Sequence, residues 1–336
     1  MAKRYLVVDA QNHYIPKEAA AKAKVAEGIN YGGRAVNPNL AYQKVFDIEA
    51  NLRQMEECGI GMCLLGLSTW IAPGGEVCKV INDAYSKLDR DYPGKYITLA
   101  HVAYQEGAPA LAELERAIKG LGLKGVTVLT SIKDITLDSE KLYPFWEKVS
   151  ELGIPVVVHP TVKAPIWGGV KYDMSSSVSR EYEIAKSVVE VLCGVLPRYP
   201  NLKFVFAHYG GGMPFLKGRI MSWFSIKPDD VPADMREIPR TLQQVEELGL
   251  IPTFNKLFDR LYFDMAGTGG FMPAAKAALM SIKPTRICFA TDYPFEFRRP
   301  NDYKAYVAAI KRLAIPEEDK KAMLGVNILR LFKVKK

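Results

Sequence analysis

Short apolar runs alternate with longer amphipathic stretches along the whole chain. Eight runs have the length and the β-branched or aromatic content of buried strands. They are Tyr5–Val8, Met62–Leu67, Tyr96–Val102, Gly125–Leu129, Pro155–Val158, Lys203–Ala207, Leu261–Asp264 and Ile287–Thr291. Strands that alternate with helices are typical of a parallel α/β fold, and eight parallel strands close a barrel. The pattern therefore predicts an α/β protein with a TIM-like (β/α)8 barrel.

Helical periodicity fills the stretches between these runs, for example over Ile48–Cys58, Ala108–Lys119 and Ser139–Leu152. The last of these ends at Gly153, and Pro155 opens the next strand, as helix stop signals predict. The sequence Asp138-Ser139-Glu140 ahead of this helix predicts an N-terminal cap.

Three connections are longer than a bare barrel needs: 16–46, 161–180 and 224–255. We expect each of them to follow a strand end. Because the loops after barrel strands build the active site, these insertions are predicted to cover a pocket. No linker or internal repeat divides the sequence, so we expect one barrel domain over residues 1–336 with loop insertions after strands.

Composition places the chain among globular proteins, with 49% hydrophobic and 24% charged residues. The best candidate for a membrane span, Ile154–Val158, is far shorter than the roughly 18 residues that span a bilayer. Met1–Asp9 lacks the pattern of a signal peptide. The five cysteines lack metal-site spacing, so we expect structural thiols in a reducing compartment and a cytoplasmic protein.

The formal net charge of +8 makes an anionic partner worth considering. Lysines and arginines are interspersed with acidic residues, and the only dense basic run is Lys333–Lys336, which we interpret as a solvated tail. The distribution therefore argues against nucleic acid and against a membrane, and it leaves a small anionic substrate as the expected partner.

Three of the four histidines come directly after an apolar strand: His13, His159 and His208. Asp292 follows the last strand, whereas His101 lies within its strand and is expected to have a structural or supporting role. The carboxyl ends of parallel strands converge on one pocket. Neutral imidazoles and a carboxylate suit a divalent cation such as Zn²⁺, with a coordination position left for water or substrate.

The segments Asp9-Ala-Gln-Asn-His13, His159-Pro160, His208-Tyr-Gly-Gly-Gly212 and Thr291-Asp292-Tyr-Pro294 occur in order from the first strand to the last. This series resembles the amidohydrolase-2 family, whose members include aminocarboxymuconate semialdehyde decarboxylase and γ-resorcylate decarboxylase. The resemblance implies that His13, His159 and Asp292 are metal ligands. It also implies that His208 acts beside the metal in proton transfer, and Asp292 is a second candidate for that role.

The first strand departs from the family pattern at Gln11, where relatives have His-x-His or Glu-x-His and both residues bind the metal. An amide oxygen is a weaker ligand than imidazole or carboxylate. Three alternatives follow: a metal with Gln11 as a weak ligand, a metal held by the other three residues alone, or a metal-free site. Zn²⁺ is the favoured ion, with Mn²⁺ as the alternative.

Further candidates follow the strand ends. Gly210–Gly212 allow a sharp turn that either presents amides to an anion or serves only as a tight connection. Arg298 is a candidate for pairing with a substrate carboxylate, and so is Arg299, although we expect these arginines to be solvated. Several aromatic residues are predicted to lie near the pocket, where they either contact an aromatic substrate or only pack in the core. They are Trp70, Trp167, Tyr172, Trp223 and Phe295.

The resemblance implies a carboxy-lyase that acts on a small aromatic or unsaturated carboxylic acid, and it suggests a homo-oligomer such as a dimer. A metal-dependent hydrolase of a lactone, amide or C–C bond is an alternative, because the same four residues would serve it. A non-catalytic or metal-free barrel that binds a small anion is another. Gln11 argues against the hydrolase, which needs a metal-bound nucleophile.

Overall fold

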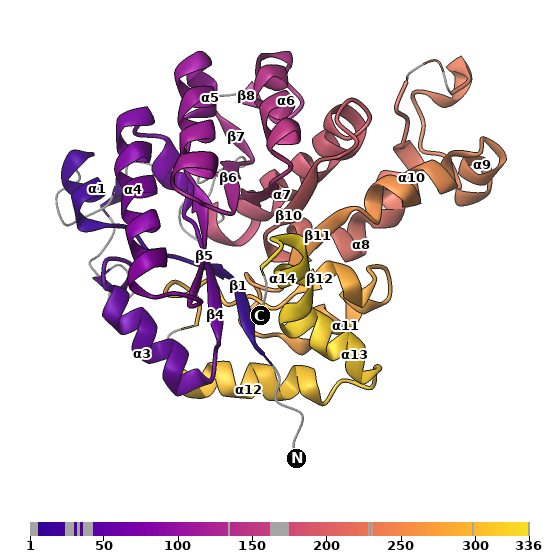
Figure 1. Ribbon diagram of the computed structural model, residues 1–336. Helices are drawn as coiled ribbons and strands as arrows, with labels where there is room; N and C mark the ends of the chain where they lie inside the picture. The colour runs from indigo at the N-terminus through magenta and orange to yellow at the C-terminus, as the bar shows by residue number, and fades with distance from the viewer. Residues whose placement is uncertain are drawn as a thin grey trace.

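Eight parallel strands form one sheet that curls into a nearly closed barrel in the computed structural model (Figure 1). Along the barrel they are β1 (Val8–Asn12), β4 (Met62–Leu65), β5 (Tyr96–Ala100), β6 (Gly125–Leu129), β9 (Pro155–His159), β10 (Lys203–Phe206), β11 (Leu261–Asp264) and β12 (Ile287–Cys288). The structure describes residues 6–23, 30–31, 34–35, 43–133, 135–161, 175–227, 229, 231–297 and 299–334. The predicted fold class is confirmed.

The barrel closes where β1 meets the segment after β12. The amide of Ala10 donates to the carbonyl of Phe289, and that of His13 donates to the carbonyl of Tyr293, both at 2.8 Å. The buried carboxylate of Asp9 accepts from the amide and the hydroxyl of Thr291, at 3.0 and 2.5 Å. Asp9 also accepts from the Asn12 side chain and the Gln11 amide. This one carboxylate therefore joins the first strand to the last.

Helices surround the barrel and cover its strands (Figure 1). They are α1 (Lys17–Lys22), α3 (Ile48–Cys58), α4 (Gly75–Asp91), α5 (Ala108–Glu115), α6 (Tyr143–Leu152), α7 (Arg180–Glu190), α8 (His208–Trp223), α9 (Leu242–Glu247), α10 (Leu250–Phe258), α11 (Met272–Leu279), α12 (Pro300–Lys311), α13 (Glu317–Lys321) and α14 (Asn327–Leu331). Two small hairpins pair β2 (Asn30–Tyr31) with β3 (Arg34–Ala35) and β7 (Ser131–Ile132) with β8 (Ile135–Thr136).

Tighter or wider helical turns extend several of these helices or stand alone. The 3₁₀ turns are Ser68–Ile71, Tyr104–Glu106, Glu140–Leu142, Ala233–Met235 and Pro284–Arg286. The π turns are Arg116–Gly120, Ser175–Ser179, Val191–Val195 and Ala322–Val326.

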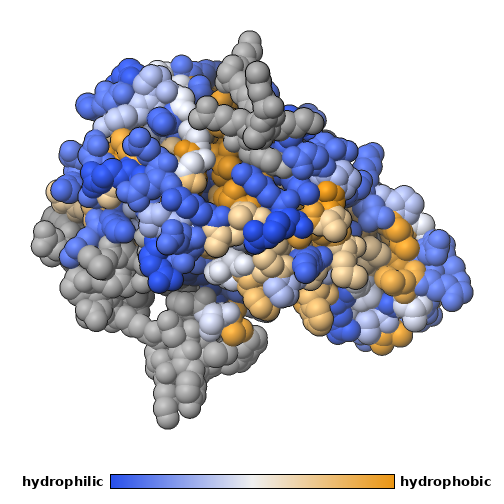
Figure 2. Space-filling model, turned by 90° about the horizontal axis from the view of Figure 1, so that it is seen from below, coloured by the Kyte–Doolittle hydropathy of each residue, from blue (hydrophilic) through white to orange (hydrophobic). Residues whose placement is uncertain are grey.

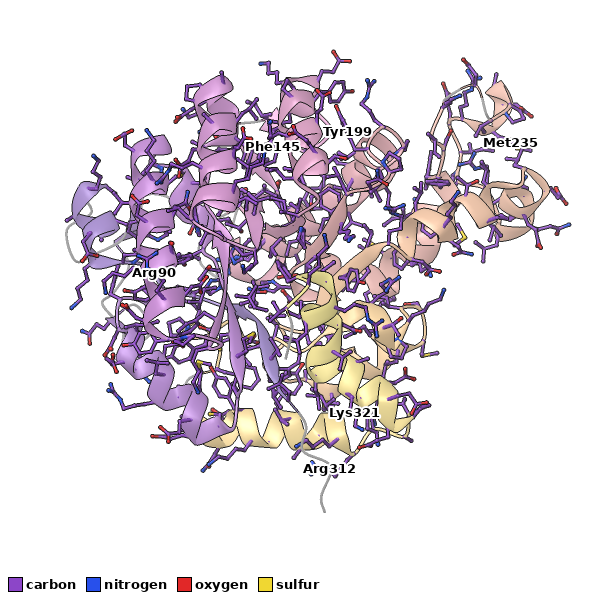
Figure 3. The ribbon with its side chains drawn as sticks, in the orientation of Figure 1. Arg90, Phe145, Tyr199, Met235, Arg312 and Lys321 are labelled. Atoms are coloured by element: carbon purple, nitrogen blue, oxygen red, sulfur yellow. The ribbon has the colours of Figure 1, made fainter. Side chains whose placement is uncertain are left out.

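Two apolar cores hold these layers together. One fills the barrel with residues such as Val8, Leu64 and Val205, and the apolar face of α14 packs onto it. The other lies between strands and helices and contains aromatic side chains, among them Phe145, which points inward beneath the helices (Figure 3). Burial of this much apolar surface is the main stabilising contribution to a barrel of this size.

The predicted strands agree with the structure to within a few residues, except at the first. We expected Tyr5–Val8, whereas β1 spans Val8–Asn12. The prediction was wrong because polar residues continue this strand, and their side chains are paired inside the protein. The predicted cap before Ser139–Leu152 is also wrong: Ser139 makes no capping hydrogen bond with its side chain, and the element starts with a 3₁₀ turn.

The three insertions differ from one another. The first contains α1 and the β2–β3 hairpin, and most of the second lies outside the described residues. The third follows helix α8 and not a strand. Connections that follow a helix lie at the end of the barrel opposite the active site, so the expectation that this insertion forms a lid over the pocket is wrong. The insertion carries α9, α10 and Met235 in a lobe that projects from the barrel (Figures 1 and 3).

Among the described helices, none has both the length and the apolar character needed to cross a bilayer. All five cysteines are free thiols, and only Cys193 is not fully buried.

Candidate metal centre and active site

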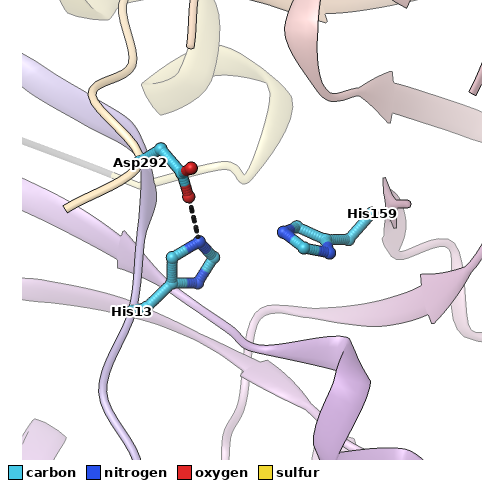
Figure 4. Close-up of side chains that lie close together, drawn as sticks. All are labelled: His13, His159 and Asp292. Carbon is cyan, nitrogen blue, oxygen red and sulfur yellow. Dashed lines mark hydrogen bonds and ion pairs between the residues drawn. The ribbon is translucent and has the colours of Figure 1, made fainter. Parts of the chain in front are cut away.

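Three side chains meet at the carboxyl-terminal end of the barrel. His13 follows β1, His159 ends β9 and Asp292 follows β12 (Figure 4). One ligand atom from each lies within 4.8 Å of the others, and all three side chains are buried. Two imidazoles and a carboxylate at this spacing form a donor set for a divalent cation.

An irregularity in β1 brings two polar side chains to this point. Val8 and Ala10 face the barrel interior, so strict alternation would turn Gln11 and His13 away from it. The pairing register between β1 and β4 shifts between Asp9 and Asn12. A shift of this kind changes which face successive side chains occupy. As a result, Gln11 and His13 both contact Asp292.

His13 is held in one orientation by its two ring nitrogens. Its Nδ1 lies 2.6 Å from the carbonyl oxygen of Gly66, and its Nε2 lies 2.7 Å from Oδ1 of Asp292. A carbonyl only accepts, so Nδ1 carries the hydrogen and donates it to Gly66. This contact orients Nε2 toward the centre of the site, where a bound cation would take the place of the hydrogen that Nε2 shares with Asp292.

Asp292 is kept ionised by its neighbours. Burial acts to raise the pKa of this carboxyl, but the hydrogen bond and charge of His13, together with His208 and His159, lower the pKa below its usual value. Oδ1 also accepts from the side-chain amide of Gln11 at 3.2 Å. The backbone at Asp292 is left-handed, with φ of 50°. Asp292 is therefore suited to bind a cation.

His159 is a neutral imidazole. Burial lowers its pKa well below the ordinary value, and the charges of His13 and Arg180 act in the same direction. Its Nδ1 lies 3.2 Å from the carbonyl of Pro160, to which it donates. The lone pair on Nε2 is then available inside the site, where its ring lies edge-on to that of His13 with centroids 5.3 Å apart.

Gln11 reaches the same centre from β1. Its Nε2 lies 3.2 Å from Oδ1 of Asp292 and 3.4 Å from Nε2 of His208. Its Oε1 is buried and has no hydrogen-bond partner among the described residues. A buried oxygen without a donor costs free energy unless something else satisfies it. A cation held by His13, His159 and Asp292 would do so, and the donor set therefore fits a metal.

His208 lies beside the cluster of His13, His159 and Asp292, and it is the first residue of α8. Burial acts to lower its pKa, but the charge and hydrogen bond of Glu181, with Asp292 and Asp264, raise it to about 9. Nδ1 lies 2.7 Å from Oε1 of Glu181. The backbone amide of His208 donates to Oδ1 of Asp264 at 2.9 Å, which fixes the start of the turn. A cationic histidine in this position can act as a general acid.

The glycines after His208 are explained by close packing. Residues 208–212 all have φ between 53° and 84°, so the chain makes a left-handed turn before α8 continues. A Cβ on Gly211 would collide with the carbonyl oxygen of Glu181, and one on Gly210 would lie 2.8 Å from the Phe263 ring. The alternative in which these amides bind an anion stays a prediction.

The other candidates are dispersed. Trp70 is buried in the core with its ring edge-on to Phe46, and Trp223 lies at the end of α8, partly exposed. Phe295 does reach the site, with its ring centroid 5.5 Å from that of His13. Arg299 is solvent-exposed and paired with Asp302 through two nitrogens. Trp167, Tyr172 and Arg298 lie outside the described residues, so their predicted contacts with substrate stay predictions.

His101 does not join the cluster. Its Nδ1 donates to the carbonyl of Leu99 at 3.1 Å, and its Nε2 accepts from the amide of Leu67 at 3.1 Å. Both ring nitrogens are thus used by the neutral form, and burial lowers the pKa of His101 to about 4. This histidine tethers the loop after β4, in agreement with the structural role expected of it.

Sequence reasoning missed Glu181, Asp264 and the carbonyl of Gly66. Asp264 ends an apolar strand, which is the same signal that pointed to His159, so the sequence could have indicated it. Burial raises the pKa of Asp264 to about 7 against the opposing effect of His208. Glu181 stands in a helix after an insertion, and no sequence pattern distinguishes it from a surface glutamate.

Comparisons with known proteins agree with this arrangement. The model of the family described as Amidohydrolase matches residues 71–334. The chain is 30% identical over 155 residues to 2-amino-3-carboxymuconate-6-semialdehyde decarboxylase of Dictyostelium discoideum, covering 46% of this chain and 43% of that protein. It is 25% identical to γ-resorcylate decarboxylase of Polaromonas sp. (strain JS666), covering 87% and 89% of the two chains.

A solved structure with the same fold is that of dihydroxybenzoic acid decarboxylase from Polaromonas sp. JS666 with bound manganese and the inhibitor 2-nitroresorcinol. It superposes with a TM-score of 0.73 at 21% identity and covers 99% of this chain and 98% of that chain.

Proposed function

Because this chain belongs to the amidohydrolase family, we propose that it is a metal-dependent carboxy-lyase acting on a small aromatic or unsaturated carboxylic acid. The observation that carries the proposal is the convergence of His13, His159 and Asp292, with His208 beside them. The names of the curated relatives support a carboxy-lyase over the hydrolase and the non-catalytic barrel.

The proposed metal ligands are His13, His159 and Asp292, with the Gln11 oxygen as a weak fourth donor. A divalent cation bound there would hold the carboxylate and a neighbouring hydroxyl of the substrate in a fixed position. Imidazole and carboxylate ligands suit Zn²⁺, and the manganese in the structural neighbour supports Mn²⁺ as the alternative.

The reaction requires the carbon that bears the carboxylate to accept a proton. The bond from this carbon to the carboxylate then breaks, its electron pair returns to the ring, and CO₂ leaves. We assign the proton to Nε2 of His208, which faces the interior of the site while Nδ1 is held by Glu181. Asp292 is less suited to this role because its lowered pKa keeps it ionised.

The test is to incubate the purified protein with a panel of hydroxylated benzoic acids and to measure CO₂ release. We expect release from at least one acid, loss of release after chelation, and recovery on addition of Mn²⁺ or Zn²⁺. His208→Ala should bind the metal but release CO₂ at least about 100-fold more slowly. Turnover of lactones or esters without CO₂ release from any acid would favour the hydrolase.

We further propose a cytoplasmic homo-oligomer, most simply a dimer. The free thiols agree with a reducing compartment. Large apolar side chains are exposed on α8 and at the two ends of α11, which packs against α8, namely Phe215 (91% exposed), Met280 (89%) and Phe271 (63%). Figure 2 shows apolar residues among hydrophilic ones on the side of the molecule toward the projecting lobe. Light scattering of wild type and a Phe215→Ser/Met280→Ser variant would test this interface.

A further inference from the structure

The first turn of helix α7 contributes a side chain to the site. Oε1 of Glu181 lies 2.7 Å from Nδ1 of His208, and the side chain of Glu181 is 29% exposed whereas that of His208 is 4% exposed. Glu181 thus reaches inward from the surface to a buried ring. Resting on the proposed function, we infer that Glu181 is a positioning residue that holds His208 with its Nε2 toward the reacting carbon.

The backbone of Glu181 is fixed relative to His208. Its carbonyl oxygen and the amide of Ala185 lie so close to Gly211 that a Cβ there would collide with both. Helix α7 therefore packs directly on the left-handed turn that starts at His208. Main-chain packing therefore holds the backbone of Glu181 close to the turn that carries the imidazole.

The ring is held from a second side. A Cβ on Gly267 would collide with Cγ, Cδ2 and Nδ1 of His208, so the ring lies against the Gly267 backbone. The Gly267 amide donates in turn to Glu296 at 2.7 Å. With Nδ1 bound to Glu181 and one flank blocked, the ring cannot rotate without losing the hydrogen bond. Nε2 remains 3.4 Å from the Gln11 amide at the centre of the site.

The carboxylate also selects the tautomer. A carboxylate only accepts hydrogen bonds, so Nδ1 of His208 keeps its hydrogen whether or not Nε2 carries one. Any proton exchanged with substrate must then pass through Nε2. A carboxylate that orients a histidine in proton transfer has this effect: one ring nitrogen keeps its hydrogen, and the other exchanges a proton with the substrate.

The kinetic test compares Glu181→Gln and Glu181→Ala with a control on the same helix, Glu183→Gln, whose side chain accepts from Ser131 and not from a histidine. We expect kcat to fall on the order of 10-fold or more in Glu181→Ala with KM changed less than about 3-fold. Glu181→Gln keeps a hydrogen-bond acceptor for Nδ1 of His208, so its kcat should fall less than that of Glu181→Ala. Adding Glu181→Ala to His208→Ala should cost nothing further, because both act through one imidazole.

The second readout needs no substrate. In the purified protein, ¹⁵N NMR of the imidazoles, assigned with His208→Ala, should show the His208 Nδ1 resonance moved by Glu181→Gln and unmoved by Glu183→Gln. The proposal would be overturned if Glu181→Gln left the His208 resonance unmoved, or if Glu181→Ala had the kcat of wild type. It would also be overturned if Glu181→Gln were as inactive as Glu181→Ala, or if the effects of Glu181→Ala and His208→Ala on kcat were additive. If wild type releases CO₂ from no acid, the proposed function fails while the NMR comparison still decides whether Glu181 orients His208.

Discussion

The ring of His208 lies directly against the backbone of Gly267, where a Cβ would collide with the imidazole. We predict that Gly267→Ala lowers kcat about 100-fold, since a displacement of about 1 Å has that effect on a reacting group. Gly269→Ala is the matched control, because Gly269 also has positive φ, 58° against 77°, but its Cβ would meet only Glu296 at 3.7 Å. Similar kcat values in the two variants would show that backbone strain alone is responsible.

Metal content should depend on the two histidine ligands. We expect about one equivalent of Zn²⁺ or Mn²⁺ per chain in the purified protein and none after chelation. His13→Ala and His159→Ala should each lose the metal, because only two of the three proposed strong ligands would remain in either variant. His101→Ala is the control and should retain metal in its folded fraction, since the ring nitrogens of His101 bond to the backbone of Leu99 and Leu67 and not to the cluster. Elemental analysis gives the answer.

Gln11 should limit metal affinity. Replacing its neutral amide by a carboxylate adds an anionic oxygen at the position of the unpartnered Oε1, so Gln11→Glu should bind the metal at least about 10-fold more tightly. Gln11→Met keeps the length and removes both polar atoms, and it should bind more weakly than wild type. Competition with a fluorescent chelator measures both. Equal affinities in all three proteins would exclude Gln11 as a ligand.

Asp9 should contribute strongly to stability through the junction between the first and last strands. Asp9→Ala removes the acceptor of hydrogen bonds from Thr291, Asn12 and Gln11. We expect the free energy of unfolding in urea to fall by about 2–4 kcal/mol. Asp83→Ala removes only an exposed ion pair with Arg116 and should cost less than about 1 kcal/mol.

His101 should make stability depend on pH. Its pKa is lowered from 6.5 to about 4 in the folded protein, so the unfolded chain takes up the proton first as pH falls. The stability contributed by neutral His101 is present above pH 6.5 and is lost as pH falls toward 4. Between about pH 7 and pH 5 the loss is about 2 kcal/mol. In urea unfolding, the free energy of unfolding of His101→Gln should therefore fall by about 2 kcal/mol less than that of wild type over this interval. Equal pH dependence of the free energy of unfolding in the two proteins would contradict the prediction.

Seven of the eight strands could be predicted because apolar residues dominate them, as is typical of strands covered on both faces of a barrel. The first strand was placed too early because Asp9, Gln11 and Asn12 are polar, and hydropathy cannot anticipate that their partners lie at the other end of the chain. The histidines were found for a related reason: His159 and His208 end apolar runs, and His13 follows the first one after a short polar segment.

Most of the residues that hold the site residues in place could not be predicted from the sequence. Glu181 belongs to a helix whose pattern is that of an ordinary amphipathic surface, and only the glycine turn beneath it brings its carboxylate to His208. The Gly66 contact uses a backbone carbonyl, which every residue has. The third insertion was assigned to the wrong end because α8 was not recognised between it and β10.

The pairing of His13 with Asp292 joins positions separated by 279 residues. Contacts of such long range form late during folding, after the intervening helices and strands have collapsed. A chain still emerging from the ribosome therefore presents neither the complete ligand set nor the closed junction at Asp9. A cation that needs His13, His159 and Asp292 together could therefore bind only after the two ends of the chain have met in the closed barrel.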